Sequence, residues 1–229
     1  MQKVSKRQIE NKKQIIESIY SVDEAIKLLK QTSTAKFIES VELHANLKID
    51  PKYADQQLRT TVTLPHGTGN NIRIAVVTSE AKISEAKNVG ADIYGSNTLI
   101  DDITKGIINF DLLIATPDMM PKLAKLGRIL GPKGLMPSPK AGTVTTELTK
   151  TLNDFKKGKF EYKADKYGIV HINFGKSNFS NLELKDNLIT LYNSIEQNRP
   201  SGVKGKYFKK IFICSTMGPS IELDLATFE

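Results

Sequence analysis

Polar and apolar residues alternate strictly over residues 39–49. The apolar positions of this stretch share one phase of the alternation: Val41, Leu43, Ala45, Leu47 and Ile49. A period of two is typical of a β-strand with one buried and one solvated face. Further strands of this style are indicated in both terminal parts of the chain, over residues 58–64, 160–164, 170–174, about 207–214 and about 220–225. The pattern predicts an antiparallel sheet built from both ends of the chain.

Two amphipathic helices accompany these strands. Ser21 and Glu24 have the spacing of a capping box, and an apolar stripe of helical period follows them. A longer stripe runs from Leu184 to Ile195. The terminal parts are therefore predicted to form an α+β domain.

The middle of the chain has a different pattern. Residues 72–78 and 110–116 are almost continuously apolar, as expected of strands that are covered on both faces. Segments of helical composition lie between and after them, together with a short strand candidate at 91–95 and a helix that ends at Gly158. Alternating strands and helices predict an α/β domain with a parallel sheet.

The two patterns predict a discontinuous domain with an insertion. Residues 1–66 and 158–229 would form the α+β domain, and residues 67–157 the inserted α/β domain. The chain would cross between them near 65–69 and 156–159. Because paired crossings form a hinge, relative motion of the two domains is expected.

Charge and cysteine content narrow the possible partners. The formal net charge is +8 and the pI is near 9.3, which favours a polyanionic partner such as nucleic acid.

Cys214 is the only cysteine, so an internal disulfide and a cysteine-based metal cluster are excluded and a reducing compartment fits. His44, His66 and His171 are scattered without ligand-pair spacing. We therefore expect no metal and no cofactor, and no apolar run suggests a signal peptide or a membrane span.

The first fourteen residues are basic and leave two interpretations open. They could form a mobile arm that binds a polyanion, or a helix with a solvated face. The cations concerned are Lys3, Lys6, Arg7, Lys12 and Lys13.

A second basic segment, KLGRILGPKGLMPSPKAGTVT, covers residues 125–145, is rich in glycine and proline, and contains no acidic residue, so we expect a rigid basic loop. Its cations are Lys125, Arg128, Lys133 and Lys140. A Walker phosphate loop fails here because Pro132 stands where the second glycine is required. Gly67 and Gly69 precede a strand and lack the third glycine of a dinucleotide fingerprint, and no G-x-S-x-G elbow occurs. No catalytic residue can be named, so a nucleotide-binding α/β enzyme is the disfavoured alternative.

Several features favour RNA instead. A further cluster of cations without an acid comprises Arg199, Lys204, Lys206, Lys209 and Lys210. Lys36 and Phe37 begin a half-solvated strand, where an aromatic beside a cation could stack on a base. Met217 lies in STMGPS, a segment that can expose a backbone turn. The residues alone leave an alternative open, in which Phe37 is core and STMGPS is an ordinary hairpin turn.

The segment GRILGPKGLMPSPKAGTVT closely resembles the signature of the large-subunit ribosomal protein one family (L-one), the universal protein of the mobile stalk beside the tRNA exit site. Other family-like blocks follow in family order: TAKFIESVELHANLKIDPK, LRTTVTLPHGTG, FDLLIATPDMM, GIVHINFGK and STMGPSIELD. The resemblance covers nearly the whole chain and is strongest to the cyanobacterial and plastid branch.

The resemblance implies a fold and a set of RNA contacts. The terminal domain would have two layers, and the inserted domain would be a three-layer, Rossmann-like unit. The rRNA contacts carry over to Lys36, Phe37, Ser40 and Glu42 of one strand and to Thr216, Met217, Gly218 and Pro219 of the final turn. Ser40 replaces the threonine of many relatives and keeps the hydroxyl. A weaker correspondence places contacts at Lys166, Tyr167 and Gly168, between two strands of the same sheet.

The resemblance also implies a function. The protein would be a structural constituent of the large subunit, a monomer that binds the rRNA stalk and takes part in the release of deacylated tRNA. Its partners would be large-subunit rRNA and exit-site tRNA, with no membrane. Repression of its own mRNA through the same site is the alternative role. The location would be the plastid (chloroplast) stroma, with the protein encoded in the organelle, or alternatively the bacterial cytoplasm.

Overall fold

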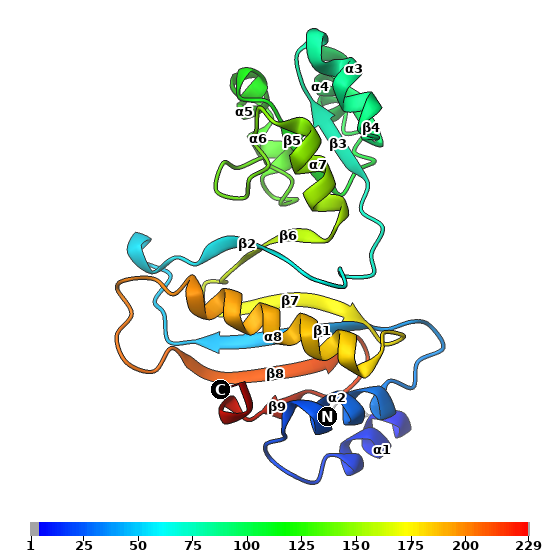
Figure 1. Cartoon of the computed structure of the whole chain (residues 1–229), viewed down its shortest axis with the longest axis vertical. Coiled ribbons are helices and arrows are strands. Elements are labelled where there is room, and N and C mark those ends of the chain that lie inside the picture. The colour runs from blue at the N-terminus through cyan, green and yellow to red at the C-terminus, as the bar shows by residue number, and fades with distance from the viewer. Residues whose placement is uncertain (1–4, 229) are drawn as a thin grey trace. The chain divides into compact units, whose positions relative to one another are not determined.

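The structure, a computed structural model, describes residues 5–228, and the chain folds as two compact units. The terminal unit combines the chain up to Gly69 with the chain from Glu161 onward, and the middle unit consists of Asn70–Phe160. Figure 1 shows the elements of each unit. No helix of the described residues has both the length and the apolar character needed to cross a membrane.

The terminal unit is built on a four-stranded sheet in the order β7-β1-β8-β9. Every neighbouring pair is antiparallel, which confirms the predicted antiparallel sheet. The strands are β1 (Ser40–Leu47), β7 (Ile169–Lys176), β8 (Phe208–Ser215) and β9 (Ile221–Leu223). Strand β1 comes from the N-terminal part of the chain, yet both of its neighbours come from the C-terminal part.

One face of this sheet forms the core of the terminal unit. Burial alternates along β1, with Val41, Leu43, Ala45 and Leu47 inaccessible to solvent. Helices α2 (Val22–Thr32) and α8 (Asn181–Gln197) pack against this face, and α8 runs across the sheet in Figure 1. The opposite face, here called the polar face, carries Glu42, His44, Asn46, His171, Asn173, Phe212 and Cys214.

N-terminal capping boxes fix where these two helices begin. Glu24 accepts hydrogen bonds from the backbone N–H (3.4 Å) and the hydroxyl (2.6 Å) of Ser21, which fixes the start of α2. Ser180 and Glu183 form the reciprocal capping box of α8. The remaining elements of the unit are α1 (Lys6–Gln14), η1 (Ala54–Gln56), η4 (Leu225–Phe228) and β2 (Arg59–Thr63), which pairs with β6 (Lys159–Lys163).

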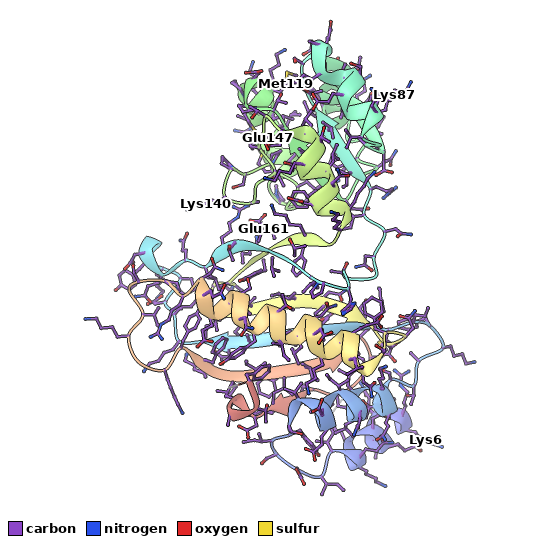
Figure 2. The ribbon with its side chains drawn as sticks, viewed as in Figure 1. Lys6, Lys87, Met119, Lys140, Glu147 and Glu161 are labelled. Carbon is purple, nitrogen blue, oxygen red and sulfur yellow. The ribbon has the colours of Figure 1, made fainter. Side chains whose placement is uncertain are left out.

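The basic N-terminal segment is a helix from Lys6 onward, which agrees with the helical interpretation. Ser5 caps α1, and Asn11 is buried with its Nδ2 donating to the Thr32 carbonyl at 2.9 Å. Lys6, at the start of the helix, is exposed (Figure 2). Lys3 lies outside the described residues.

The middle unit is built on a three-stranded parallel sheet in the order β4-β3-β5. Its strands are β3 (Ile74–Val77), β4 (Ile93–Gly95) and β5 (Leu112–Ala115). All of β3 is buried, as its continuous apolar run predicted. One core cluster joins Ile74 and Val76 to α3 and α7, and another joins Ala75 and Val77 to α4, α5 and α6. Helices therefore cover both faces of this sheet.

The helices of the middle unit follow the predicted segments, with one addition. They are η2 (Glu80–Lys82), α3 (Ile83–Asn88), α4 (Asn97–Thr104), η3 (Pro117–Met119), α5 (Met120–Ala124), α6 (Gly127–Leu130) and α7 (Leu148–Lys156). Helix α6 lies inside the basic segment that was expected to be a loop. It forms because Leu126 and Leu130 are buried one helical turn apart.

Asn187 anchors the chain where it leaves the terminal unit. Its side chain, fully buried in α8, accepts from the His66 N–H at 3.2 Å. Its Nδ2 donates to the carbonyls of Gly67 (3.0 Å) and Phe174 (2.8 Å). One amide therefore satisfies backbone groups of the outgoing segment and of the sheet edge.

We expect Asn187→Leu to destabilise the terminal unit by about 1–3 kcal/mol, because the backbone groups of His66, Gly67 and the buried Phe174 lose a side-chain partner. Denaturant unfolding measures the loss, and hydrogen exchange at the His66 amide should quicken. The matched control is Asn193→Leu, an exposed site on the same helix, which should change stability by no more than about 0.5 kcal/mol. Equal stability of the two variants would contradict the anchoring role.

Candidate RNA-binding surface

The structure brings together two segments that were expected to contact RNA. Ser40 donates its backbone N–H to Thr216 Oγ1 at 3.0 Å, and the Thr216 N–H donates to the Ser40 carbonyl at 3.0 Å. These bonds place the segment before β1 against the turn after β8. We call this surface the loop–turn patch, and its members are Lys36, Phe37, Ser40, Thr216, Met217, Gly218 and Pro219.

Lys36 and Phe37 differ from the prediction in one respect. They lie in a bend before β1, which begins only at Ser40. The strand cannot extend further back with both neighbours, because its pairing begins at Ser40 with Lys176 and at Val41 with Ser215. Both residues are therefore presented by a loop at the sheet end rather than from a strand face.

Two large apolar side chains are exposed on the loop–turn patch. Phe37 is 55% exposed and Met217 is 47% exposed. The alternative in which Phe37 belongs to the core is therefore wrong. An exposed aromatic ring and an exposed polarisable thioether can each contact the faces of bases or sugars.

Glu39 holds the two segments in place. Its side chain is only 1% exposed, and its carboxylate accepts from the backbone N–H of Ala35 (3.0 Å) and of Met217 (2.9 Å). Sequence reasoning missed this role. The available signal was its phase, because position 39 falls on the buried side of the alternation that continues at Val41. An acid in a buried phase requires hydrogen-bond partners.

A glycine lies in the turn itself. A Cβ atom on Gly218 would lie 2.4 Å from Ser215 Oγ, so a larger residue would require the Ser215 hydroxyl to move. The Gly218 N–H donates to the Ser215 carbonyl at 3.0 Å. At the neighbouring strand, Lys176 Nζ donates to Ser40 Oγ at 2.8 Å. Gly218 is partly accessible to solvent, so a ligand can approach its backbone.

Lys166 and Gly168 lie elsewhere. The Gly168 carbonyl accepts from the Leu47 N–H at 3.0 Å, which places it at the other end of β1 from Ser40. The eight residues of β1 span about 25 Å at the usual strand rise, so the two sets of residues are not adjacent. Lys166 is exposed, with its Nζ 5.1 Å from the Tyr167 ring centre.

The expectation that Lys166 and Gly168 join two strands of the same sheet is wrong. Strand β6 belongs to a separate two-stranded sheet with β2, whereas β7 belongs to the four-stranded sheet. An isolated bridge joins Ala164, just after β6, to Val170 of β7. Along their lengths, β6 pairs with β2 and β7 pairs with β1.

The polar face gathers residues that are distant in sequence. Nδ1 of His44 lies 2.8 Å from Nδ1 of His171, and Nε2 of His44 lies 3.2 Å from Cys214 Sγ and 3.7 Å from Glu42. His44 and His171, which are far apart in the sequence, lie on strands β1 and β7 and are neighbours in the folded chain. They meet because β1 and β7 pair in a register that puts them opposite each other.

Burial alters the protonation of this group. Burial, and then the neighbouring His171, lower the pKa of His44 below its ordinary value. Burial, and then the charge of Glu42, raise the pKa of the Cys214 thiol to about 11. At neutral pH the polar face therefore carries a neutral imidazole beside a protonated thiol.

The basic segment of the middle unit presents its cations to solvent. Lys125, Arg128, Lys133 and Lys140 are all exposed, and Figure 2 marks Lys140 on the loop that follows α6. Among the described residues none of these side chains forms a salt bridge. The segment is fixed to the sheet by a bridge between Val144 and Ala115 of β5. It is a supported cationic surface able to approach phosphates.

Comparison with known proteins identifies the family. The family described as "Ribosomal protein L1p/L10e family" matches residues 29–219. The chain belongs to this family. The large ribosomal subunit protein uL1c of Trieres chinensis is 69% identical over the full length of both chains, as is that of Phaeodactylum tricornutum. The protein uL1 of Synechococcus sp. is 58% identical over this whole chain and 97% of its own.

Membership of the L1p/L10e family decides between a ribosomal protein and a nucleotide-binding enzyme. The match includes Lys36, Phe37 and the final turn up to Pro219, and it also includes the basic segment at 125–145. The protein is a ribosomal protein of this family and not an enzyme, in agreement with the failed phosphate motifs. The resemblance of the sequence to the L-one family is confirmed.

Proposed function

We propose that the protein is a structural constituent of the large ribosomal subunit and that its terminal unit binds large-subunit rRNA through the loop–turn patch. The observation that supports this most directly is the exposure of Phe37 and Met217 on adjoining segments held by Glu39. The relatives named as large ribosomal subunit proteins match over the full chain, which supports the same assembly for this protein.

Binding would rest on shape and backbone contacts. Phe37 and Met217 would pack on bases or sugars, and Lys36 would approach a phosphate. The Thr216 hydroxyl, the Ser40 hydroxyl and the open Gly218 backbone would meet polar groups of the RNA. Glu42 would accept from a ribose hydroxyl or a base amino group. Lys166 would contact the same RNA about one strand length away, and the buried Gly168 would shape the turn that presents Lys166.

The middle unit would serve a second contact. Its exposed cations would face a further part of the rRNA stalk or the departing tRNA. The segments near 65–69 and 156–159 would act as a hinge between a two-layer terminal domain and a three-layer, Rossmann-like inserted domain. Movement of the stalk beside the exit site would accompany release of deacylated tRNA.

The relatives named uL1c support a location in the plastid stroma.

Salt dependence tests the electrostatic part. Affinity for a structured rRNA stalk fragment should fall steeply with salt, because each phosphate contact contributes about 0.7–0.9 to the slope of log affinity against log salt concentration. Replacing all cations of the basic segment with glutamine should reduce this slope if that segment reaches the fragment. A flat salt response of the wild type would contradict the proposal.

Single substitutions give a matched comparison. Lys140→Gln should lower the slope, whereas Lys87→Gln, at an exposed position of α3 in the same unit, should leave it unchanged (Figure 2). Equal slopes for the two variants would show that the basic segment takes no part in RNA binding. Co-sedimentation of the protein with the large subunit, and its release in high salt, tests the assembly directly.

A further inference from the structure

Three side chains of the polar face direct metal-ligand atoms toward one point. They are Glu42 and His44 of β1 and Cys214 of β8, and their ligand atoms all lie within 4.8 Å of one another. His44 Nε2 is 3.2 Å from Cys214 Sγ and 3.7 Å from Glu42 Oε2. In a tetrahedral zinc site the usual metal–ligand bond lengths separate the ligand atoms by about 3.3–3.6 Å. Small side-chain shifts would therefore complete the geometry.

The sheet arranges these ligands before any metal arrives. Glu42 and Cys214 are direct cross-strand partners, so their side chains rise from the same face. His44 follows Glu42 by two residues along β1 and therefore shares that face. Ligands on paired strands are held more rigidly than ligands on loops, which lowers the cost of organising them.

A second layer of contacts orients the histidine ligand. Nδ1 of His44 lies 2.8 Å from Nδ1 of His171, which leaves Nε2 of His44 toward Cys214. His171 is in turn fixed by Asp165, whose Oδ2 lies 3.7 Å from His171 Nε2. Histidine ligands of metals are ordinarily held in this way, by a partner on the nitrogen that does not bind the metal.

We propose that Glu42, His44 and Cys214 bind a zinc ion, with water in the fourth position. A thiolate with an imidazole favours zinc over magnesium or calcium, which prefer oxygen ligands only. On binding, a Zn–S bond forms and the thiol proton passes to solvent. Because a water position stays open, the site is a labile binding site rather than a closed structural one. The inference does not depend on the proposed RNA function, although Glu42 appears in both.

Cobalt substitution tests the site. Titration of the full-length reduced protein with Co²⁺ should produce a thiolate-to-cobalt charge-transfer band and the visible bands of tetrahedral cobalt, saturating at one equivalent. Added Zn²⁺ should abolish both. Cys214→Ser should remove the charge-transfer band, and His171→Asn should weaken binding by about 10–100-fold. His66→Asn is the control, because His66 lies away from the cluster and pairs with Asp186.

A second measurement needs no substitution at all. Cys214 is the only cysteine, so alkylation of the wild-type protein reports on this thiol alone, and Zn²⁺ should slow it at least tenfold. Absence of the cobalt bands, or their persistence in Cys214→Ser, would overturn the proposal. An alkylation rate that Zn²⁺ does not change would also overturn the proposal. The contact between His44 and Cys214 would then be only a hydrogen bond between thiol and imidazole.

Discussion

Phe37→Ala and Met217→Ala are each expected to weaken binding of a large-subunit rRNA stalk fragment by about 1–3 kcal/mol, the scale of one lost stacking contact. Their side chains are 55% and 47% exposed, so the folded protein loses little packing when they are shortened. Affinity should therefore fall while the free energy of unfolding stays near the wild-type value. Binding titrations at fixed salt, paired with denaturant unfolding, measure the two quantities.

The control for these variants is Leu182→Ala. Leu182 is also a large exposed apolar residue of the terminal unit, but it lies at the start of α8. Its replacement should leave RNA affinity unchanged. The double variant at Phe37 and Met217 should show a coupling energy if both side chains contact one RNA segment. Unchanged affinity in both single variants would place the RNA contact on another part of the surface.

Glu39→Ala is expected to damage stability and affinity together. The backbone N–H groups of Ala35 and Met217 would lose their carboxylate acceptor, at a cost of about 1–3 kcal/mol for a buried group left unsatisfied. The segment with Phe37 and the turn with Met217 would then move independently, so RNA affinity should fall at least as far as in either contact variant. Hydrogen exchange at the Met217 amide should quicken because that bond is lost.

Two further variants separate the loss of the hydrogen bonds to Glu39 from the general effect of removing an acidic residue. Glu39→Gln keeps one carbonyl acceptor and should fall between the wild type and Glu39→Ala in both measurements. Glu196→Ala removes an exposed acid from α8, and it should change stability by no more than about 0.5 kcal/mol. Wild-type amide exchange at Met217 in Glu39→Ala would show that the carboxylate does not hold the turn.

The strands of the fold could be predicted because the spacing of apolar residues within each strand shows whether one or both of its faces are buried. Strand β1 is polar on one face and β3 is apolar throughout, and local alternation is sufficient to distinguish them. Phe37 and Met217 were RNA candidates from their chemistry, but only the resemblance favoured them over the structural alternative, since neither residue reveals exposure from its neighbours in sequence. Their exposure depends on where β1 begins and where β8 turns.

Contacts between distant strands could not be predicted in the same way. His44 meets His171 and Cys214 only through the register of β1 with β7 and β8, and a shift of one residue would send these side chains to the other face. Asn187 likewise resembles any polar residue in a helix until Gly67 and Phe174 are placed beside it. Such partners depend on tertiary pairing, which local patterns do not encode.

The central position of β1 has a consequence for biosynthesis. Strand β1 leaves the translating ribosome early, but its partners β7 and β8 begin only at Ile169 and Phe208. At about 5–20 residues per second, β1 waits roughly 10–30 s for β8. The middle unit, whose strands are contiguous in the chain, can fold during that interval. The loop–turn patch is thus completed last, so a nascent chain cannot present it until synthesis is almost finished.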